Sequence, residues 1–126
     1  MALKEFSYRG KTLQQIKQMN IKEFAELLPA RLRRSLIREQ RETHKPLLKK
    51  LAKKDSVKTH CRDIVILPLM IGKTINVYNG KEFFAVRVEA DMIGHYLGEF
   101  VQTRKKVQHS APGIGATRSS ASLSVK

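Results

Sequence analysis

Acidic residues are scarce in this sequence. Among 126 residues, 11 are Asp or Glu and 25 are Lys or Arg, which gives a formal net charge of +14. A protein with so few acids repels itself unless a polyanion compensates the excess positive charge. Nucleic acid is therefore the first candidate partner, and an anionic membrane surface is the second.

Long apolar runs and paired cysteines are missing too. No run approaches the roughly 18–20 apolar residues of a membrane-spanning helix, and the N-terminus lacks the basic start and apolar core of a signal peptide. Cys61 is the single cysteine, which rules out an internal disulfide and suits a reducing compartment. We therefore expect a cytoplasmic protein with no membrane partner.

The histidines offer little for a metal site. His44, His60, His95 and His109 do not pair with Cys61, or with one another, at the spacings that zinc sites use. We therefore expect no bound metal. Cys61 is better interpreted as a small, partly buried residue at the start of a strand.

Catalytic and cofactor motifs are also absent. Asp63, Glu89 and Asp91 are the candidates for a carboxylate cluster that supports metal-assisted nuclease chemistry, but nothing at catalytic spacing accompanies them. Residues 113–118 approach a dinucleotide-binding fingerprint, but Arg118 stands where its third glycine belongs and no strand precedes the segment. The sequence therefore predicts no enzyme, no cofactor and no small-molecule substrate.

The positive charge is unevenly distributed. Residues 1–62 hold 17 basic and 6 acidic residues, residues 63–126 hold 8 and 5, and no acid follows Glu99. This pattern favours a nearly neutral folded centre between two cationic arms that a polyanion orders. The chain then divides into three parts, namely a helical basic N-terminal extension (1–56), an α+β core (57–104) and an extended basic C-terminal tail (105–126).

Short helices are predicted in the N-terminal part. Capping-box spacings at Thr12 and Asn20 indicate two helix starts. Pro29 ends the second helix and leads into a third, and Pro46 begins a fourth with Leu47 and Leu51 on its inner face.

The third of these helices carries its basic residues on one side. Leu32 and Leu36 lie on another face at the period of 3.6 residues per turn. Four arginines fall within an arc of about 80° and form what we call the arginine ridge: Arg31, Arg34, Arg38 and Arg41. An ordinary solvated helix face is the alternative, but the basic surroundings favour a surface that binds phosphates.

Strands are predicted after residue 63. Residues 64–67 form an apolar run rich in β-formers, and residues 74–78 and 81–88 flank Asn79-Gly80. That dipeptide between alternating residues is a strong signal for a two-residue type I′ hairpin turn.

The register of this hairpin determines its core face. A turn at Asn79-Gly80 places Ile75 opposite Phe84 and Val77 opposite Glu82. The apolar residues that then share one face are Ile75, Val77, Phe84, Val86 and Val88. We expect this face to be buried.

The C-terminal region is less regular. Tyr96 and Phe100 either stack on bases, as aromatic residues do in single-strand binders, or pack against the sheet beside Leu97, which we favour. Beyond Phe100 the apolar pattern fades, and residues 110–124 are rich in Ser, Gly and Ala, which is typical of an extended tail.

Short motifs along most of the chain resemble a known family. They are Lys58-Thr59-His60-Cys61-Arg62-Asp63, Leu67-Pro68, Met70-Ile71-Gly72, Val77-Tyr78-Asn79-Gly80-Lys81, Met92-Ile93-Gly94-His95-Tyr96-Leu97-Gly98-Glu99-Phe100 and Thr103-Arg104-Lys105. At this spacing, residues 57–104 resemble the S-nineteen family of small-subunit ribosomal proteins. Residues 6–10 and 112–120 are similar to its archaeal and eukaryotic branch.

The resemblance implies a structural protein in the head of the small ribosomal subunit. Its partners would be the 3′ major domain of small-subunit rRNA, a neighbouring S-thirteen family protein and, near the decoding region, tRNA. Besides the arginine ridge, the residues expected to bind rRNA are Lys58, Arg62, Lys73, Asn79, Gly80, Lys81, His95, Arg104, Lys105 and Lys106. The tail residues expected to point toward tRNA are Gly113, Gly115, Thr117 and Arg118.

In such a protein, phosphate contacts supply affinity and the shape of the folded RNA supplies specificity. The alternative function is that of a free-standing basic nucleic-acid-binding protein. It would require base-reading polar residues on an exposed helix, and the arginine ridge offers partners for phosphates only.

Overall fold

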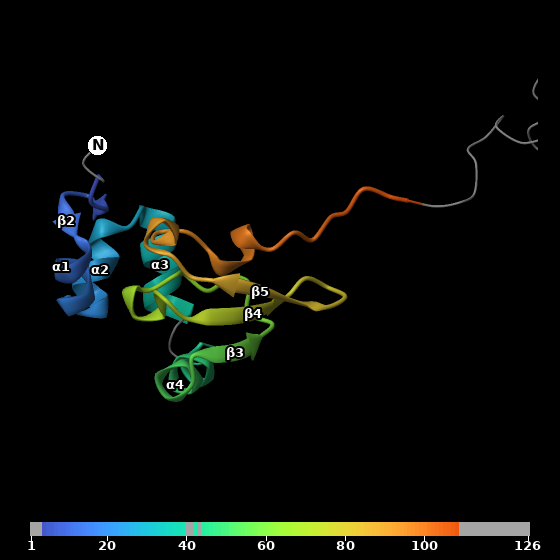
Figure 1. Cartoon of the computed structure of the whole chain (residues 1–126). Helices are drawn as coiled ribbons and strands as arrows, with labels where there is room; N and C mark the ends of the chain where they lie inside the picture. Colours follow the sequence, from blue (N-terminus) through green and yellow to red (C-terminus); the bar gives the residue numbers. More distant parts are fainter. Residues whose placement is uncertain (1–3, 40–41, 43, 109–126) are drawn as a thin grey trace, which may run out of the picture.

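The computed structural model describes residues 4–39, 42 and 44–108. Within these residues, helices and two small sheets form an α+β fold, as the sequence predicts. Figure 1 shows α1 and α2 at one end, the strands β3, β4 and β5 at the centre, and the chain after residue 101 leading away from the folded part. In the described part, no helix is both long enough and apolar enough to cross a membrane.

A small hairpin opens the described chain. β1 (Ser7–Tyr8) pairs in the antiparallel sense with β2 (Lys11–Thr12). The turn between them holds Arg9 at φ 51° and Gly10 at φ 78°, a left-handed conformation that glycine adopts without steric cost.

Two short helices follow, and both begin as predicted. α1 (Leu13–Gln18) starts after Thr12, whose N–H donates to Gln15 Oε1 at 3.0 Å. α2 (Ile21–Leu27) starts after Asn20, whose N–H donates to a Glu23 carboxylate oxygen at 3.2 Å. These reciprocal contacts satisfy backbone donors that the first helical turn leaves without partners.

The next two helices pack their leucines inward. α3 (Ala30–Glu39) buries Leu32 and Leu36, and α4 (Lys45–Lys53) buries Leu47 and Leu51. These are the residues that helical periodicity places on the apolar faces, so the predicted orientation of α3 and α4 is confirmed.

The central sheet has the order β3-β4-β5. β3 (Ser56–Thr59) runs parallel to β4 (Thr74–Tyr78), which pairs antiparallel with β5 (Phe83–Arg87). The predicted strand at residues 64–67 is wrong. These four residues are buried and form only one isolated bridge, Val65 with Tyr96. A short buried apolar run looks the same in sequence whether or not it joins a sheet.

The predicted hairpin register is wrong by two residues. Ile75 lies opposite Val86, and Val77 lies opposite Phe84. The cause is the side chain of Asn79, whose Oδ1 accepts the N–H groups of both Lys81 and Glu82 at 2.9 Å. Antiparallel pairing therefore continues to Asn79, whose N–H donates to the Glu82 carbonyl at 3.0 Å, and the tip lies at Gly80-Lys81 instead of Asn79-Gly80.

The shift changes which predicted core residues are buried. Ile75, Val77, Val86 and Val88 are at most 4% exposed, whereas Phe84 lies nearer the hairpin tip and is 49% exposed. One buried apolar cluster combines this face of the sheet with residues of all four helices. The proposed division at residues 56 and 57 stays a prediction, although this cluster includes residues from both sides of it.

The exposed fractions of Ile75 and Phe84 predict that truncating these two residues lowers the free energy of unfolding by unequal amounts. Ile75→Ala should lower the free energy of unfolding by about 2–5 kcal/mol, because it leaves a cavity in the core. Phe84→Ala should cost about 1–2 kcal/mol, since half of the ring already contacts solvent. Chemical denaturation of the two variants measures both values. Equal costs would contradict the observed register.

Candidate nucleic-acid interface

The described part of the arginine ridge faces solvent. Arg31, Arg34 and Arg38 are exposed on α3, while Leu32 and Leu36 hold the opposite side in the core. The fourth predicted member, Arg41, lies outside the described residues. The exposed side of α3 therefore presents three guanidinium groups on a helix whose orientation is set by packing.

Arg33 lies on the same helix but has an internal role. Its Nε donates to the carbonyl of Ala25, and its Nη2 donates to the carbonyls of Glu26 and Leu28, each at 3.1 Å. The last carbonyls of a helix lack partners and carry partial negative charge. Arg33 therefore caps the C-terminal end of α2 and fixes the angle between α2 and α3.

A hollow of about 530 Å³ separates α3 from two loop segments. Its lining includes Arg31, Arg62 and Tyr96. Gly98 sets its shape, because its N–H donates to the Arg62 carbonyl at 2.8 Å and a Cβ there would lie 2.8 Å from the same oxygen. Glycine is thus required for the close approach to the Arg62 backbone, and the exposed Arg62 lines the same hollow as Arg31.

Gly94 joins the N-terminal hairpin to this region. It has φ +83°, and a Cβ at this position would lie 2.6 Å from the hydroxyl of Tyr8. Both glycines of the resembled motif are therefore explained by packing against residues distant in sequence.

The aromatic residues near this hollow pack as we favoured. The Tyr96 hydroxyl lies 3.1 Å from Ser35 Oγ, and both Tyr96 and Phe100 contact the buried cluster. The exposed His95 places Nδ1 2.8 Å from a Glu99 carboxylate oxygen and its ring edge-on to Phe100. Its predicted contact with rRNA stays a prediction, with one ring nitrogen held by Glu99.

Lys73 is also held within the fold. Its amine donates to the carbonyl of Leu51, in the last turn of α4, and lies 3.9 Å from Asp55. The side chain is only 23% exposed, and its main contacts join α4 to the start of β4. Its predicted rRNA contact remains untested.

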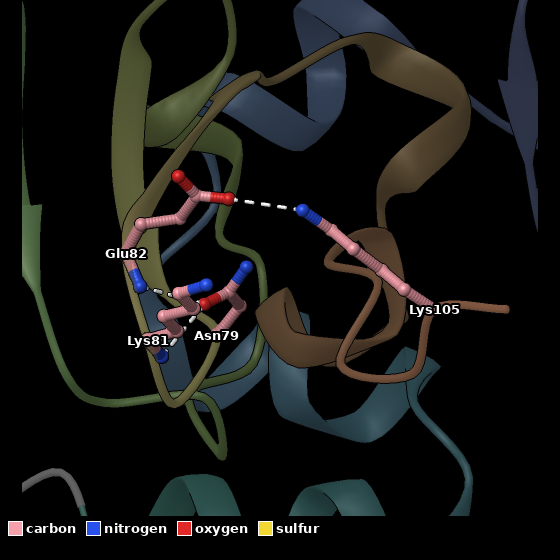
Figure 2. A network of polar contacts seen from close by, with 4 residues as sticks. All are labelled: Asn79, Lys81, Glu82 and Lys105. Atoms are coloured by element: carbon pink, nitrogen blue, oxygen red, sulfur yellow. Dashed lines mark hydrogen bonds and ion pairs between the residues drawn. The ribbon is translucent and has the colours of Figure 1, made fainter. Parts of the chain in front are cut away.

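The hairpin tip brings together residues from two predicted groups. Figure 2 shows Asn79 accepting the two backbone N–H groups, and Lys105 reaching Glu82 from the start of the tail. The Lys105 amine lies 3.1 Å from Glu82, with both side chains more than half exposed. Gly80 has φ +104°, a turn conformation that favours glycine. The next residue, Lys81, is exposed.

The beginning of the tail is open to solvent. Residues 102–108 are exposed and have no regular secondary structure, so Arg104, Lys105 and Lys106 present their charges outward. The predicted tail residues Gly113, Gly115, Thr117 and Arg118 lie outside the described residues.

One group of potential metal ligands was not expected from the sequence. His44, Cys61 and Asp63 place one ligand atom each within 4.8 Å of one another, and the buried His44 Nε2 lies 3.5 Å from Asp63. Structural zinc sites use four protein ligands. We therefore interpret the group as a histidine–carboxylate pair beside the partly buried Cys61, which follows β3 and is not at a strand start.

The sheet face turned away from the core was missed by the sequence analysis. The strand residues of this open face are Ser56, Lys58, Thr74, Asn76, Tyr78, Phe83, Ala85 and Arg87, and none of them is buried. The rings of His60, Tyr78 and Phe83 cluster there at centroid distances of 4.6–5.2 Å. The adjacent pair Phe83-Phe84 was an available signal, because neighbouring strand residues point to opposite faces.

Comparison with known proteins decides the family. The family model for ribosomal protein S19 matches residues 30–109 of this chain. The chain belongs to the ribosomal protein S19 family. The small ribosomal subunit protein uS19 of Thermoplasma volcanium is 52% identical over 124 residues, which is 98% of this chain and 82% of that protein. The uS19 proteins of Thermoplasma acidophilum and Picrophilus torridus are each 50% identical over the same shares.

Membership in the S19 family confirms the resemblance, and the similarity to archaeal relatives agrees with the archaeal and eukaryotic branch that the arms indicated. It makes the chain a structural ribosomal protein and not an enzyme. The family match begins at α3 and ends at residue 109, within the first residues of the tail. It therefore includes the arginine ridge, the hollow, the central sheet and the hairpin tip.

The hairpin tip should depend on the acceptor oxygen of Asn79. Asn79→Ala removes two hydrogen bonds and should lower the free energy of unfolding by about 1–2 kcal/mol. It should also speed amide exchange at Lys81 and Glu82, measured by NMR. Asn79→Asp keeps an acceptor oxygen and is the matched control, which should retain slow exchange. Equal exchange in the two variants would show that another contact shapes the turn.

Proposed function

We propose that this protein binds the 3′ major domain of small-subunit rRNA, in the head of the small ribosomal subunit, in the cytoplasm. The observation that supports it most is the exposed row of Arg31, Arg34 and Arg38 on a helix packed into the core of an S19-family protein. The relatives are named as small-subunit proteins, and the net charge of +14 requires a polyanionic partner.

The described ridge is suited to a phosphate backbone for a geometric reason. Residues three and four apart on a helix lie on one side, so the guanidinium groups follow one another along the axis of α3. Arginine forms paired hydrogen bonds with phosphate oxygens. No acidic residue lies between Arg31 and Arg38 to neutralise these guanidinium groups. Arg62 adds a further cation across the hollow.

Removing the ridge charges tests this proposal. Changing Arg31, Arg34 and Arg38 together to Gln should weaken binding to small-subunit rRNA and lower the slope of log K against log salt by about 2–3, because each phosphate contact contributes about 0.7–0.9. Filter binding at several salt concentrations gives the slope, and co-sedimentation with small subunits gives the assembly.

Three exposed lysines near α1 and α2 provide the charge-matched control. Changing Lys11, Lys17 and Lys22 to Gln removes the same formal charge from residues outside the predicted interface. This variant should keep most of the salt dependence. A slope that falls equally in both variants would mean that net charge alone, and not the ridge, determines binding.

The S-thirteen family protein is the proposed protein neighbour. Support comes from the family resemblance and from an apolar groove between α1, α2 and residues 67–69. Ile21 and Leu69 border this groove and are each 46% exposed. A protein surface is a better partner for such residues than RNA, because it can bury them against apolar side chains.

The tail is proposed to reach tRNA near the decoding region. Residues 105–126 would span roughly 70 Å when extended, at about 3.3 Å per residue. The contact at its root, Lys105 with Glu82, is an exposed ion pair, and such pairs hold a segment weakly. Such a length would allow the tail to reach a partner beyond the folded part.

Truncation after Val107 separates assembly from tail function. The shortened protein keeps the buried cluster and the described ridge, so it should enter small subunits at the level of the full chain. Binding of tRNA to the purified subunits, or decoding accuracy, should be impaired. Failure of the truncated protein to enter subunits would show that the tail is an anchor and would contradict this role.

A further inference from the structure

The two faces of the central sheet differ in exposure and chemistry. On the core face, Val57, Ile75, Val77 and Val86 are buried. On the open face, the eight strand residues are exposed or half-buried, and they include aromatic, polar and basic side chains but no acid. The side chain of Asn76 donates to Ser56 Oγ at 3.3 Å, which orders the polar part of this face.

Three rings form a continuous patch on the open face. The His60 centroid lies 4.6 Å from Tyr78 and 5.2 Å from Phe83, and Tyr78 lies 5.2 Å from Phe83. They come from three different segments: the chain after β3, the end of β4 and the start of β5. Mutual packing holds the rings in place, yet Phe83 keeps 38% of its surface exposed.

Positive charge accompanies the rings. The Lys58 amine lies 5.3 Å from the centroid of Phe83, within the range of a cation–π contact. Arg87 is exposed further along the same face of β5. Aromatic rings beside Lys and Arg match the two parts of a nucleotide, since bases stack on rings and phosphates pair with cations.

We propose that the open face of the sheet is a stacking platform for unpaired bases of RNA, with Phe83 as its main ring. The platform rests on the proposed function, because it names which RNA elements the protein would take: loops or bulges, whose bases are free to stack. A regular RNA helix would offer only its backbone to this face. Phosphates next to the base stacked on Phe83 would lie near Lys58, and those of following nucleotides would lie nearer Arg87, four residues along β5.

The chain supplies a matched pair of aromatic residues for the test. Phe83 and Phe84 are adjacent in β5 and both exposed, but they lie on opposite faces of the sheet. Phe83→Leu should weaken binding to a single-stranded RNA oligonucleotide carrying one fluorescent 2-aminopurine by about 5- to 100-fold, and should abolish the quenching of that base. Phe84→Leu should change affinity less than about twofold. Unfolding curves of both full-length variants check that the fold is retained.

Salt dependence distinguishes stacking from charge. Phe83→Leu should leave the slope of log K against log salt unchanged, whereas Lys58→Gln should lower it by about 0.7–0.9. Equal effects of Phe83→Leu and Phe84→Leu, or unchanged quenching in Phe83→Leu, would overturn the platform. If small-subunit rRNA still binds through the arginine ridge in that case, the proposed function stands without it. If the wild-type chain did not bind small-subunit rRNA, the proposed function itself would be refuted.

Discussion

One apolar cluster has to hold together a chain whose net charge is +14. Exposed like charges repel one another over about 10 Å at 0.1 M salt, so burial is the only term large enough to oppose them. The cluster achieves this by drawing residues from α1 to α4, from one face of the sheet and from the segments around it, including Ile16, Leu36, Leu51, Ile75 and Leu97. The consequence is that the four α-helices and the central sheet each have one apolar side inward and one polar side left for partners.

The basic residues divide into two kinds according to their surroundings. Arg33 and Lys73 donate to carbonyls near the ends of α2 and α4, where helix dipoles favour positive charge. Arg31, Arg34 and Arg38 have buried leucines behind them and solvent in front. Positively charged residues therefore do not all mark RNA contacts, because Arg33 and Lys73 stabilise the C-terminal ends of α2 and α4.

Local signals predicted local structure well. The capping boxes at Thr12 and Asn20, and the leucine faces of α3 and α4, depend on residues within a few positions of one another and were predicted from them. The hairpin register failed because one side-chain oxygen of Asn79 took two backbone donors. Sequence patterns describe which residues suit a turn, but not whether the Tyr78 carbonyl or the Asn79 side chain accepts the Lys81 N–H.

The residues of the candidate interface were harder to predict because several contacts join distant segments. Nothing in the spacing of Gly94 indicates that Tyr8 will pack against it, or that Lys73 will reach Leu51. The open sheet face was missed for the same reason, since His60, Tyr78 and Phe83 meet only once β3, β4 and β5 are in register.

The ridge and the open face suit different features of one folded RNA. Phosphates are present at every nucleotide, so the ridge gains affinity at any position along a backbone and loses it as salt rises. Rings gain affinity only where a base is unpaired, and that gain depends little on salt. If both proposed surfaces bind RNA, the protein would select RNA in which a helix backbone and an unpaired segment lie at the separation that the fold imposes. Specificity then comes from RNA shape, without base-edge reading.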